Sequence, residues 1–405
     1  MSIFWLNEYV LLKIFSYLSD NDLQNLVLTN ERFKEIIEYG VYAPKTLGLL
    51  LCSTSKDAKI NSRNCASLSF YDRIKISSNW KSGRYKETIS FPRKKLFFTK
   101  THLEADKFYI TNGGYLRIYD RSFKEPDSID KSEYFEINSK TSRSDISNFS
   151  KKNEELFIGQ VCGNGILYDC DSFLQTEQKL HDINEYLTCV DFQDNIYVSG
   201  SDRKFKIWKK DIEFDELVSL DLQYSFWNYF MCAKISGGKV FGGLYADLQQ
   251  RRALKEIDIE TGVVDSLNCN SFSIYDLKVK DDNILYTGHF DTTTRVFDRR
   301  TDSDEIIFID PFDSSAYCIE HDGNFALLCG TKHHSRVNLY DIRVPNRVTQ
   351  IYYPGKQKRQ DSSPVYSLCC DSRYLFITTA VNLRVFDFKA DWAEVKDYSK
   401  IISKW

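Results

Sequence analysis

The chain has 405 residues and a formal net charge of −3, and 15% of its residues are aromatic. The nearly balanced charge argues against a general nucleic-acid-binding protein, which would carry a basic excess. The sequence contains no run of about 18 apolar residues, and its first residues lack the basic start and small-residue cleavage site of a secretory signal. We therefore expect an intracellular protein, cytoplasmic or nuclear, that binds neither nucleic acid nor a membrane.

The 11 cysteines are scattered along the chain without a CxxC pair. This pattern is typical of buried reduced thiols rather than of a metal site or a disulfide framework. The sequence also lacks the phosphate-binding loop, the nucleophile elbow and the zinc-peptidase motif. Two adjacent histidines, His333 and His334, cannot easily both face one metal ion. We predict no catalysis, no metal and no cofactor.

The first forty residues predict three short helices. Apolar residues recur at spacings of three to five in the first of them, which indicates one apolar stripe. Ser19 to Asp22 resembles a capping box that begins a second helix. Asn30 is a candidate N-cap for a third helix, which Gly40 would close. Because so few residues cannot bury their apolar surface alone, something else must cover part of it.

Residues 6–18 resemble the opening of an F-box, whose pattern is roughly L-P-x-E-[LI]-L-x-x-I-[LF]-x-[YF]-L. Asn7 stands where proline is usual, and residues 26–37 lack the usual V-C-[KR]-x-W run. The resemblance implies that an apolar helix face docks on a Skp-family adaptor, which a cullin scaffold holds. The candidate contact and core residues are Leu6, Val10, Leu11, Ile14, Phe15 and Leu18. An ordinary helical cap on the following domain is the alternative.

A helical or irregular linker is expected over residues 46–84. Four leucines between residues 47 and 51 suggest a helix, and a polar stretch follows them. The segment Asn79-Trp80-x-x-Gly83 resembles the lead-in from the F-box to the repeats in F-box/WD-repeat proteins. A large buried tryptophan there would fasten the linker to the next domain and fix the distance between the two.

A strand-like run, usually closed by an aromatic–Asp pair, recurs seven times along the rest of the chain. The runs end at residues 120, 169, 209, 258, 298, 341 and 387, at steps of 40–49 residues. Two further strands precede a run, and a fourth falls between repeats. Four short strands at this period are typical of propeller blades. The predicted fold is mostly β: a seven-bladed WD-repeat-type β-propeller over residues 85–388, preceded by a small α-helical F-box domain over residues 1–45.

The spacing resembles the WD repeat, in which a loop His, a strand Ser or Thr, a turn Asp and a strand Trp form one buried hydrogen-bonded set. The matching candidates in the clearest copy are His181, Ser199, Asp202 and Trp208. Another copy has Thr287, Asp291 and Phe297 at the family spacing, but phenylalanine cannot donate a hydrogen bond. We therefore expect degenerate repeats that are held more by aromatic packing than by polar sets.

Only three strands are found for the seventh blade, at residues 365–370, 374–379 and 383–388. The segment from Tyr85 to Phe91 is the natural candidate for its outer strand, which would tie the two ends of the ring and remove a free sheet edge. In the tail, residues 389–405, apolar side chains are spaced for a short helix that docks on the propeller. These are Trp392, Val395, Tyr398, Ile401, Ile402 and Trp405.

The order of F-box, linker and seven weak blades resembles the F-box/WD-repeat family. Residues 73–84, 362–368 and 382–387 carry the resemblance most clearly. It implies a substrate-recognition subunit of an SCF-type cullin ubiquitin ligase, with a Skp-family adaptor, a cullin and an unknown protein substrate as partners. The ligase chemistry would belong to the partner proteins. The alternative is a non-catalytic WD-repeat scaffold that no longer binds the adaptor.

A substrate would bind at the propeller face that holds the loops entering the first strands and those joining the second strands to the third. Aromatic and basic residues in these loops have the composition of interface hot spots, and the basic ones could read a phosphorylated substrate through charge-assisted hydrogen bonds. The candidates are Tyr224, Phe226, Trp227, Tyr229, Arg251, Arg252, Lys332, His333 and Arg336, with Arg203, Tyr245, His289 and His334 beside them. The alternative is that the aromatics pack on the rim and the arginines are ordinary surface.

Overall fold

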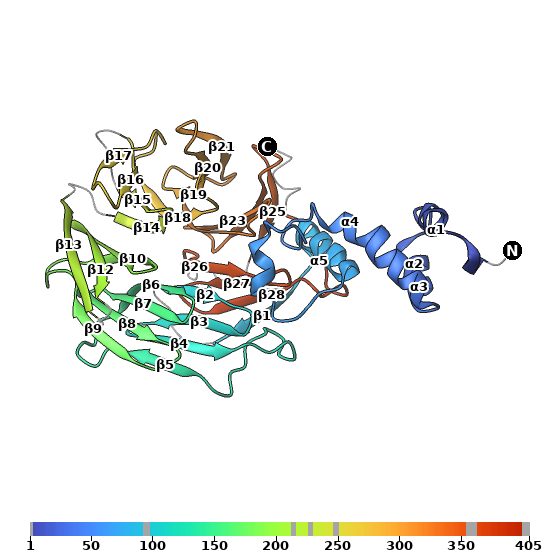
Figure 1. Ribbon diagram of the computed structural model, residues 1–405, viewed down its shortest axis with the longest axis horizontal. Coiled ribbons are helices and arrows are strands. Elements are labelled where there is room, and N and C mark those ends of the chain that lie inside the picture. The colour runs from blue at the N-terminus through green and yellow to red at the C-terminus, as the bar shows by residue number, and fades with distance from the viewer. Residues whose placement is uncertain are drawn as a thin grey trace.

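Seven four-stranded antiparallel sheets form a ring, and a group of short helices extends from one side of it (Figure 1). This computed structural model describes residues 3–91, 98–211, 216–225, 230–245, 251–353 and 363–398. The predicted number of blades is confirmed, and each of the seven recurring runs forms the third strand of its blade. The first strands lie next to one another around a central channel.

Six blades take their strands from consecutive parts of the chain. Blade one has β2 (Thr101–Leu103), β3 (Lys107–Asn112), β4 (Tyr115–Asp120) and β5 (Phe135–Asn138). Blade two has β6 (Ile146–Lys152), β7 (Glu155–Gln160), β8 (Asn164–Asp169) and β9 (Gln175–Lys179). Blade three has β10 (Leu187–Gln193), β11 (Ile196–Ser201), β12 (Lys204–Asp211) and β13 (Glu216–Ser225).

The next three blades repeat this order. Blade four has β14 (Phe230–Ser236), β15 (Lys239–Leu244), β16 (Leu254–Asp258) and β17 (Val264–Ser266). Blade five has β18 (Ile274–Val279), β19 (Ile284–His289), β20 (Thr293–Asp298) and β21 (Ser303–Ile309). Blade six has β22 (Ala316–His321), β23 (Ala326–Thr331), β24 (Val337–Asp341) and β25 (Val348–Tyr352).

Blade seven joins the two ends of the ring. It consists of β26 (Ser367–Cys370), β27 (Tyr374–Thr378), β28 (Leu383–Asp387) and, as its outer strand, β1 (Lys86–Ser90). The register pairs Lys86 with Asp387 and Ser90 with Leu383. The closure predicted from the sequence is therefore confirmed, and the ring has no open gap between its first and last blades.

Neighbouring blades interlock where a glycine of the second strand faces a cysteine of the first. A Cβ atom built on each of these glycines would lie 2.6 Å from the cysteine sulfur, which is too close for any side chain. The same Cβ would also crowd a residue at or just before the start of the inner strand of the next blade. The pairs are Gly200 with Cys189, Gly243 with Cys232, and Gly330 with Cys318. All eleven cysteines are free thiols, and most are buried.

The clearest WD set forms, but with one member different from the prediction. The Trp208 indole donates to the Ser199 hydroxyl (2.9 Å), which lies 2.8 Å from His181 Nε2. His181 Nδ1 faces Glu185 at 3.1 Å, so Glu185 takes the place expected of Asp202. Asp202 instead accepts from the backbone N–H of Tyr186, because the turn is one residue short. Burial lowers the pKa of His181 to about 4, so the imidazole is neutral at pH 7.

Blade five also departs from the expected set. The Thr287 hydroxyl lies 2.7 Å from His289 Nε2, and His289 Nδ1 lies 2.7 Å from the Ser271 hydroxyl. Asp291 pairs with Arg295 instead of joining Thr287. The second strand therefore supplies its own histidine, and Phe297 only packs in the core.

The N-terminal helices are α1 (Glu8–Phe15), α2 (Asp20–Val27) and α3 (Glu31–Glu35), and the predicted caps Ser19 and Asn30 hold the starts of the second and third. Asn7 caps the first helix by accepting from the backbone N–H of Val10, so it starts the helix where the family has proline. Gly40 does not end the third helix, which continues as a π-helix (Ile36–Tyr42) and α4 (Ala43–Thr46). A Cβ at Gly40 would lie 2.2 Å from the Leu12 side chain, so glycine is needed there for close packing.

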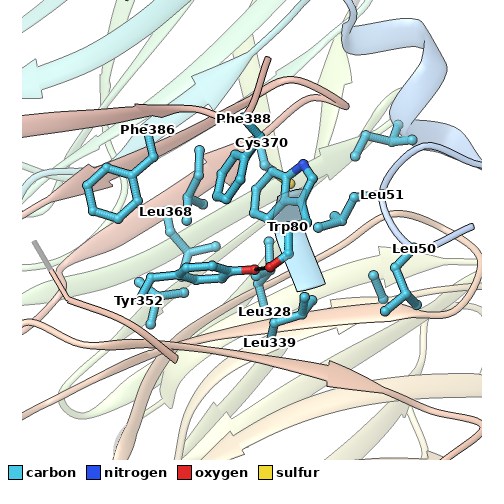
Figure 2. Packing of buried hydrophobic residues seen from close by; sticks show 14 of the residues in the cluster. Leu50, Leu51, Trp80, Leu328, Leu339, Tyr352, Leu368, Cys370, Phe386 and Phe388 are labelled. Atoms are coloured by element: carbon cyan, nitrogen blue, oxygen red, sulfur yellow. Dashed lines mark hydrogen bonds between the residues drawn. The ribbon is translucent and has the colours of Figure 1, made fainter. Parts of the chain in front are cut away.

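The linker fastens the helices to blades six and seven. The leucines after Thr46 do not extend the helix; Leu50 and Leu51 are buried instead, and Leu51 has a positive φ of 62°. A 3₁₀-helix (Lys59–Arg63) and α5 (Phe70–Ser82) follow. Within α5, Trp80 is fully buried, stacks on Phe388 and donates to the Ser372 carbonyl at 2.9 Å (Figure 2). The expected anchoring tryptophan is therefore present.

The described part of the tail, up to Tyr398, contains no helix, contrary to the sequence prediction. It runs beside the end of α5, where Val395 forms a bridge with Arg84 and the Lys396 N–H donates to the Gly83 carbonyl. Gly83 has a φ of +70° and a Cβ there would lie 2.4 Å from the Lys396 carbonyl oxygen, so the tail can approach only a glycine. Ile401, Ile402 and Trp405 lie outside the described residues. None of the helices in the described ranges has the length and apolar character that crossing a membrane requires.

Candidate protein-binding surfaces

The predicted F-box residues divide into a core and an outer layer. Leu11 and Phe15 are fully buried, and the Phe15 ring meets Phe33 edge-on at 5.4 Å. Leu6, Ile14 and Leu18 are half-buried around this core, and Val10 is exposed. The structure thus separates the inward residues from those that could face a partner, which the sequence left unsorted.

A set of large apolar side chains on the helices remains in solvent. Trp5, Tyr9 and Leu28 keep 83%, 79% and 85% of their surface exposed. We call the exposed set the F-box surface; it comprises Ile3, Trp5, Tyr9, Val10, Tyr17, Leu28 and Tyr39. Exposed apolar groups gathered on one small domain mark an interaction site. Of these seven residues only Val10 was a sequence candidate, because an apolar stripe does not by itself distinguish core from surface.

The helices contact the rest of the chain through one side only. Phe70, Tyr71 and Ile74 of α5 pack against their core. The rings of Tyr42 and Tyr71 lie 5.3 Å apart, and those of Tyr39 and Phe70 lie 5.7 Å apart. The group α1–α3 stands clear of the ring beyond α4 and α5 (Figure 1). The helices are therefore not a cap sealed onto the propeller.

The second candidate surface is the mouth of the central channel. In five blades the first strand carries a β-bulge near its start, which leaves one residue unpaired between two paired ones. A bulge re-aims the side chain of its extra residue, and all five line the cavity at the channel mouth. They are Ser147, Thr188, Met231, Tyr275 and Tyr317. No sequence motif marked them, because a bulge does not change the blade period.

Aromatic rings form an arc on one side of this mouth. Phe98, Tyr366, Tyr317 and Tyr275 follow one another with ring centroids 5.3, 5.9 and 5.2 Å apart. We call these four residues the aromatic arc. Tyr186 lines the cavity as well, and it is 63% exposed. The cavity has a volume of about 340 Å³ and is open to solvent.

Deeper in the channel, charged side chains pair with one another. Asp191 is buried and lies within 3.5 Å of the ammonium groups of Lys152 and Lys234. Burial alone would raise the pKa of Asp191, but these two lysines hold it below its usual value. Glu320 likewise faces Lys278 and Arg63, at 3.3 and 3.2 Å. Below the mouth, the channel is therefore polar, with its carboxylates ionised.

Lys100 is different, because it lines both the channel and its mouth. No carboxylate in the described ranges forms an ion pair with its ammonium group, and the side chain is half-buried. Its charge acts on the Cys318 thiol across the channel and opposes the rise in pKa that burial imposes on that thiol. Lys100 is therefore a cation that borders both the channel and its mouth, without a carboxylate partner in the described ranges.

The linker lies at the other end of the channel. The Asp322 carboxylate accepts from the Leu51 N–H, and the Asp322 carbonyl accepts from the Ile60 N–H. Trp80 reaches the Ser372 carbonyl. Asp322 and Ser372 lie in turns between first and second strands, whereas the mouth lies where first strands begin. The linker therefore leaves the mouth uncovered.

The substrate-binding candidates that the sequence suggested on the propeller differ in burial and in position. Arg336 is fully buried and makes two hydrogen bonds of 2.7 Å with Asp310, so it cannot contact a substrate; this corrects the prediction. His289 is also buried, as described above. Arg252 lines a shallow pocket with Glu256, Asp265 and Asp302 beside blade four, away from the mouth.

The remaining candidates are at the surface, or their side chains are outside the part of the chain that the structure describes. Arg203, Arg251, His333 and His334 are exposed, and Tyr245 is half-buried beside Tyr275. The Lys332 ammonium lies 5.5 Å from the centre of the Phe290 ring. Tyr224 is on β13, but its side chain is outside the described part, as are residues Phe226, Trp227 and Tyr229. None of the exposed candidates named here lines the mouth cavity.

Known proteins match the chain in both of its parts. The F-box domain model matches residues 3–39. The human protein F-box/WD repeat-containing protein 4 is 24% identical over 330 residues, which cover 78% of this chain and 77% of the relative. Its mouse counterpart is 23% identical over the same shares. Residues 73–84 and 362–368 resemble dactylin, a member of the F-box/WD-repeat family. The match to these two relatives is consistent with that resemblance.

A solved structure supports the fold alone. The crystal structure of the computationally designed Ika8 protein superposes with a TM-score of 0.52, at 14% sequence identity, over 74% of this chain and 97% of that one. The F-box match, the seven-bladed ring and the similarity to F-box/WD repeat-containing protein 4 over most of the chain together support the F-box/WD-repeat family for this protein.

Proposed function

We propose that the chain is the substrate-recognition subunit of an SCF-type cullin ubiquitin ligase. The F-box surface would dock on a Skp-family adaptor and through it on a cullin, and the propeller mouth would hold the protein to be ubiquitinated. The observation that carries the proposal is the set of exposed apolar side chains on the N-terminal helical domain, whose helices α1–α3 stand clear of the ring. The chain itself would perform no chemistry, and transfer of ubiquitin would fall to its partners.

Two features support the adaptor contact. The F-box core closes through Leu11 and Phe15 without help from a partner, so the domain can present Trp5, Tyr9 and Val10 as a preformed surface. Large aromatic side chains of this kind are the usual hot spots of protein interfaces, where their truncation often costs about 2 kcal/mol or more. The surface is also apolar enough to be hidden in a helix-face interface.

The position of the mouth supports the substrate contact. The linker docks at the opposite end of the channel, so a substrate at the mouth and an adaptor at the helices would not compete for space. A single subunit could therefore bind both at once, as a recognition subunit must.

The test is co-purification of the full chain with a Skp-family adaptor. Tyr9→Asp and Trp5→Asp place a charge on exposed positions, so we expect both variants to fold and to lose adaptor binding by about 30-fold or more. The matched control is Phe173→Asp, which changes an exposed aromatic residue of blade two and should bind normally. Adaptor binding that survives both F-box substitutions would contradict the proposal.

The rival function is a WD-repeat scaffold whose helices no longer bind the adaptor. It is kept by two departures from the F-box pattern: Asn7 stands where proline is usual, and residues 26–37 lack the V-C-[KR]-x-W run. It predicts that even the unmodified chain fails to co-purify with the adaptor, whereas the propeller still captures its partner.

A further inference from the structure

We infer that the channel mouth recognises an unphosphorylated segment of the substrate in which an apolar or aromatic side chain lies next to a carboxylate. This inference rests on the proposed function and names the substrate class for that site. The aromatic arc would hold the apolar side chain, and the Lys100 ammonium would hold the acidic group.

The apolar half follows from the lining of the cavity. The aromatic arc contributes four rings in continuous contact, and Met231, Ile146 and Val161 line the same space. Aromatic rings bury much surface and stack well on one another, so an inserted ring or branched aliphatic group gains most there. A cavity of about 340 Å³ falls at the small end of ligand pockets. It suits one or two side chains rather than a folded surface.

The acidic half follows from charge. Below the mouth, Lys152, Lys234 and Lys278 each face a carboxylate, but Lys100 has none among the described residues. Because Lys100 has no carboxylate partner among the described residues, a substrate carboxylate would be attracted to it through a charge-assisted hydrogen bond. Asp145 also lines the cavity. It would repel a second negative group on its side and so would favour one carboxylate placed near Lys100.

A phosphate group fits this cavity less well. It carries nearly two negative charges at neutral pH and is usually read by clustered arginines. In the described lining of the mouth no arginine is present, and Lys100 is the one cation. The buried arginines Arg336 and Arg295 already form ion pairs, Arg336 with Asp310 and Arg295 with Asp291 and Asp304. A single ammonium balances one carboxylate.

The experiment is a binding assay between the purified full chain and an array of short synthetic peptides. Each peptide has a central Phe or Leu, and its neighbours are Asp, Asn or phosphoserine. We expect the Asp peptides to bind about tenfold more tightly than the Asn peptides, and peptides whose central residue is Ser to lose binding. Stronger binding of the phosphoserine peptides, or equal binding of the Asp and Asn peptides, would overturn the inference.

Variants of the chain assign the effect to the mouth. Lys100→Met keeps most of the stem length, and we expect it to abolish the preference for Asp over Asn while the Phe preference remains. Tyr317→Ala should weaken the Phe peptides instead. If Tyr317→Ala proves unstable in a thermal melt, Tyr186→Ser, an exposed position of the same cavity, replaces it. Lys209→Met, at an exposed lysine of blade three, is the matched control and should bind as the unmodified chain does.

The two proposals can fail separately. Normal adaptor co-purification with no peptide selectivity would leave the ligase subunit standing and refute this substrate class. An Asp preference that survives Lys100→Met would also refute it, because the charge would then lie elsewhere. Loss of adaptor binding with intact peptide selectivity would refute the ligase proposal alone.

Discussion

Replacing Trp80 by alanine should detach the linker from the propeller and lower its stability strongly. Trp80 is fully buried in the cluster shown in Figure 2. Its ring stacks on Phe388 with centroids 3.5 Å apart, and its indole N–H donates to the Ser372 carbonyl at 2.9 Å. Its own carbonyl accepts from the Tyr352 hydroxyl at 2.8 Å. The Trp80 ring also meets the Tyr352 ring edge-on at 5.7 Å, so this residue joins α5 to blade seven and to blade six.

The expected loss can be worked out from these contacts. Removing a buried tryptophan side chain costs about 3–5 kcal/mol through lost burial and the cavity left behind. The Ser372 carbonyl, left with only the weak thiol donor of Cys52, adds about 1–3 kcal/mol unless water enters to bind it. A loss of about 4–8 kcal/mol compares with a total stability of about 5–15 kcal/mol for a typical domain. Trp80→Phe keeps most of the apolar contact and loses the donor, so it should cost about half as much.

Urea unfolding followed by far-ultraviolet circular dichroism measures the free energy, and limited proteolysis of residues 53–69 reports release of the linker. We expect cleavage there to rise sharply in Trp80→Ala and slightly in Trp80→Phe. Trp392→Ala, at a tryptophan that is mostly exposed, is the matched control and should change neither measurement. A loss below about 1 kcal/mol for Trp80→Ala, or equal losses for the two Trp80 variants, would refute the assignment of Trp80 as the anchor.

Three further predictions follow from the fold. Deleting residues 85–91 removes the strand that closes the ring, so the propeller should unfold cooperatively, and a normal melting curve would contradict the role of that strand. Asp310→Asn leaves the buried guanidinium of Arg336 without its counter-charge and should cost about 3–5 kcal/mol, while the double variant with Arg336→Met should recover much of the loss in a urea titration. Burial lowers the pKa values of His181 and His321 from 6.5 to about 4 and about 3. As the pH falls below 6.5 the unfolded chain therefore binds protons first, and urea midpoints should drop steadily toward pH 4; a flat midpoint over that window would contradict burial of the neutral rings.

The number of blades and their closing strand could be predicted because both depend on the period of the sequence. Each third strand matches one of the seven recurring runs, five of which close on an aromatic–Asp pair, and the missing outer strand of blade seven left one candidate segment. The polar set of blade three was predicted in part, since the spacing of His181, Ser199 and Trp208 matches the family. Glu185 was missed because its role depends on the fold of the loop that brings it beside His181, not on a fixed distance in sequence.

The binding surfaces were harder to predict for two reasons. Apolar residues at helical spacing can face the core or the solvent, and Val10 and Ile14 differ in this respect although they are four positions apart on one stripe: Val10 is exposed and Ile14 is half-buried. At the mouth, Tyr275 and Tyr317 are aimed by β-bulges, which depend on backbone pairing and leave no mark in composition. For Arg336 the prediction failed for a different reason. A basic residue in a loop was expected to be exposed, but its ion pair with Asp310 holds it in the interior.

The unbroken helical segment from Glu31 to Thr46 connects the F-box to the linker and sets the orientation of the F-box relative to the propeller. Each residue of an α-helix advances the chain by about 1.5 Å and turns it by about 100°. Adding or removing a single residue near the end of this segment, after Tyr42, would turn the F-box core relative to the propeller and break its contacts with Phe70, Tyr71 and Ile74 of α5. In a cullin assembly that angle would decide which lysines of a captured protein come within reach of the transferred ubiquitin. The length of this helical segment is therefore constrained by the geometry of the assembly, and not by the stability of the F-box or the propeller alone.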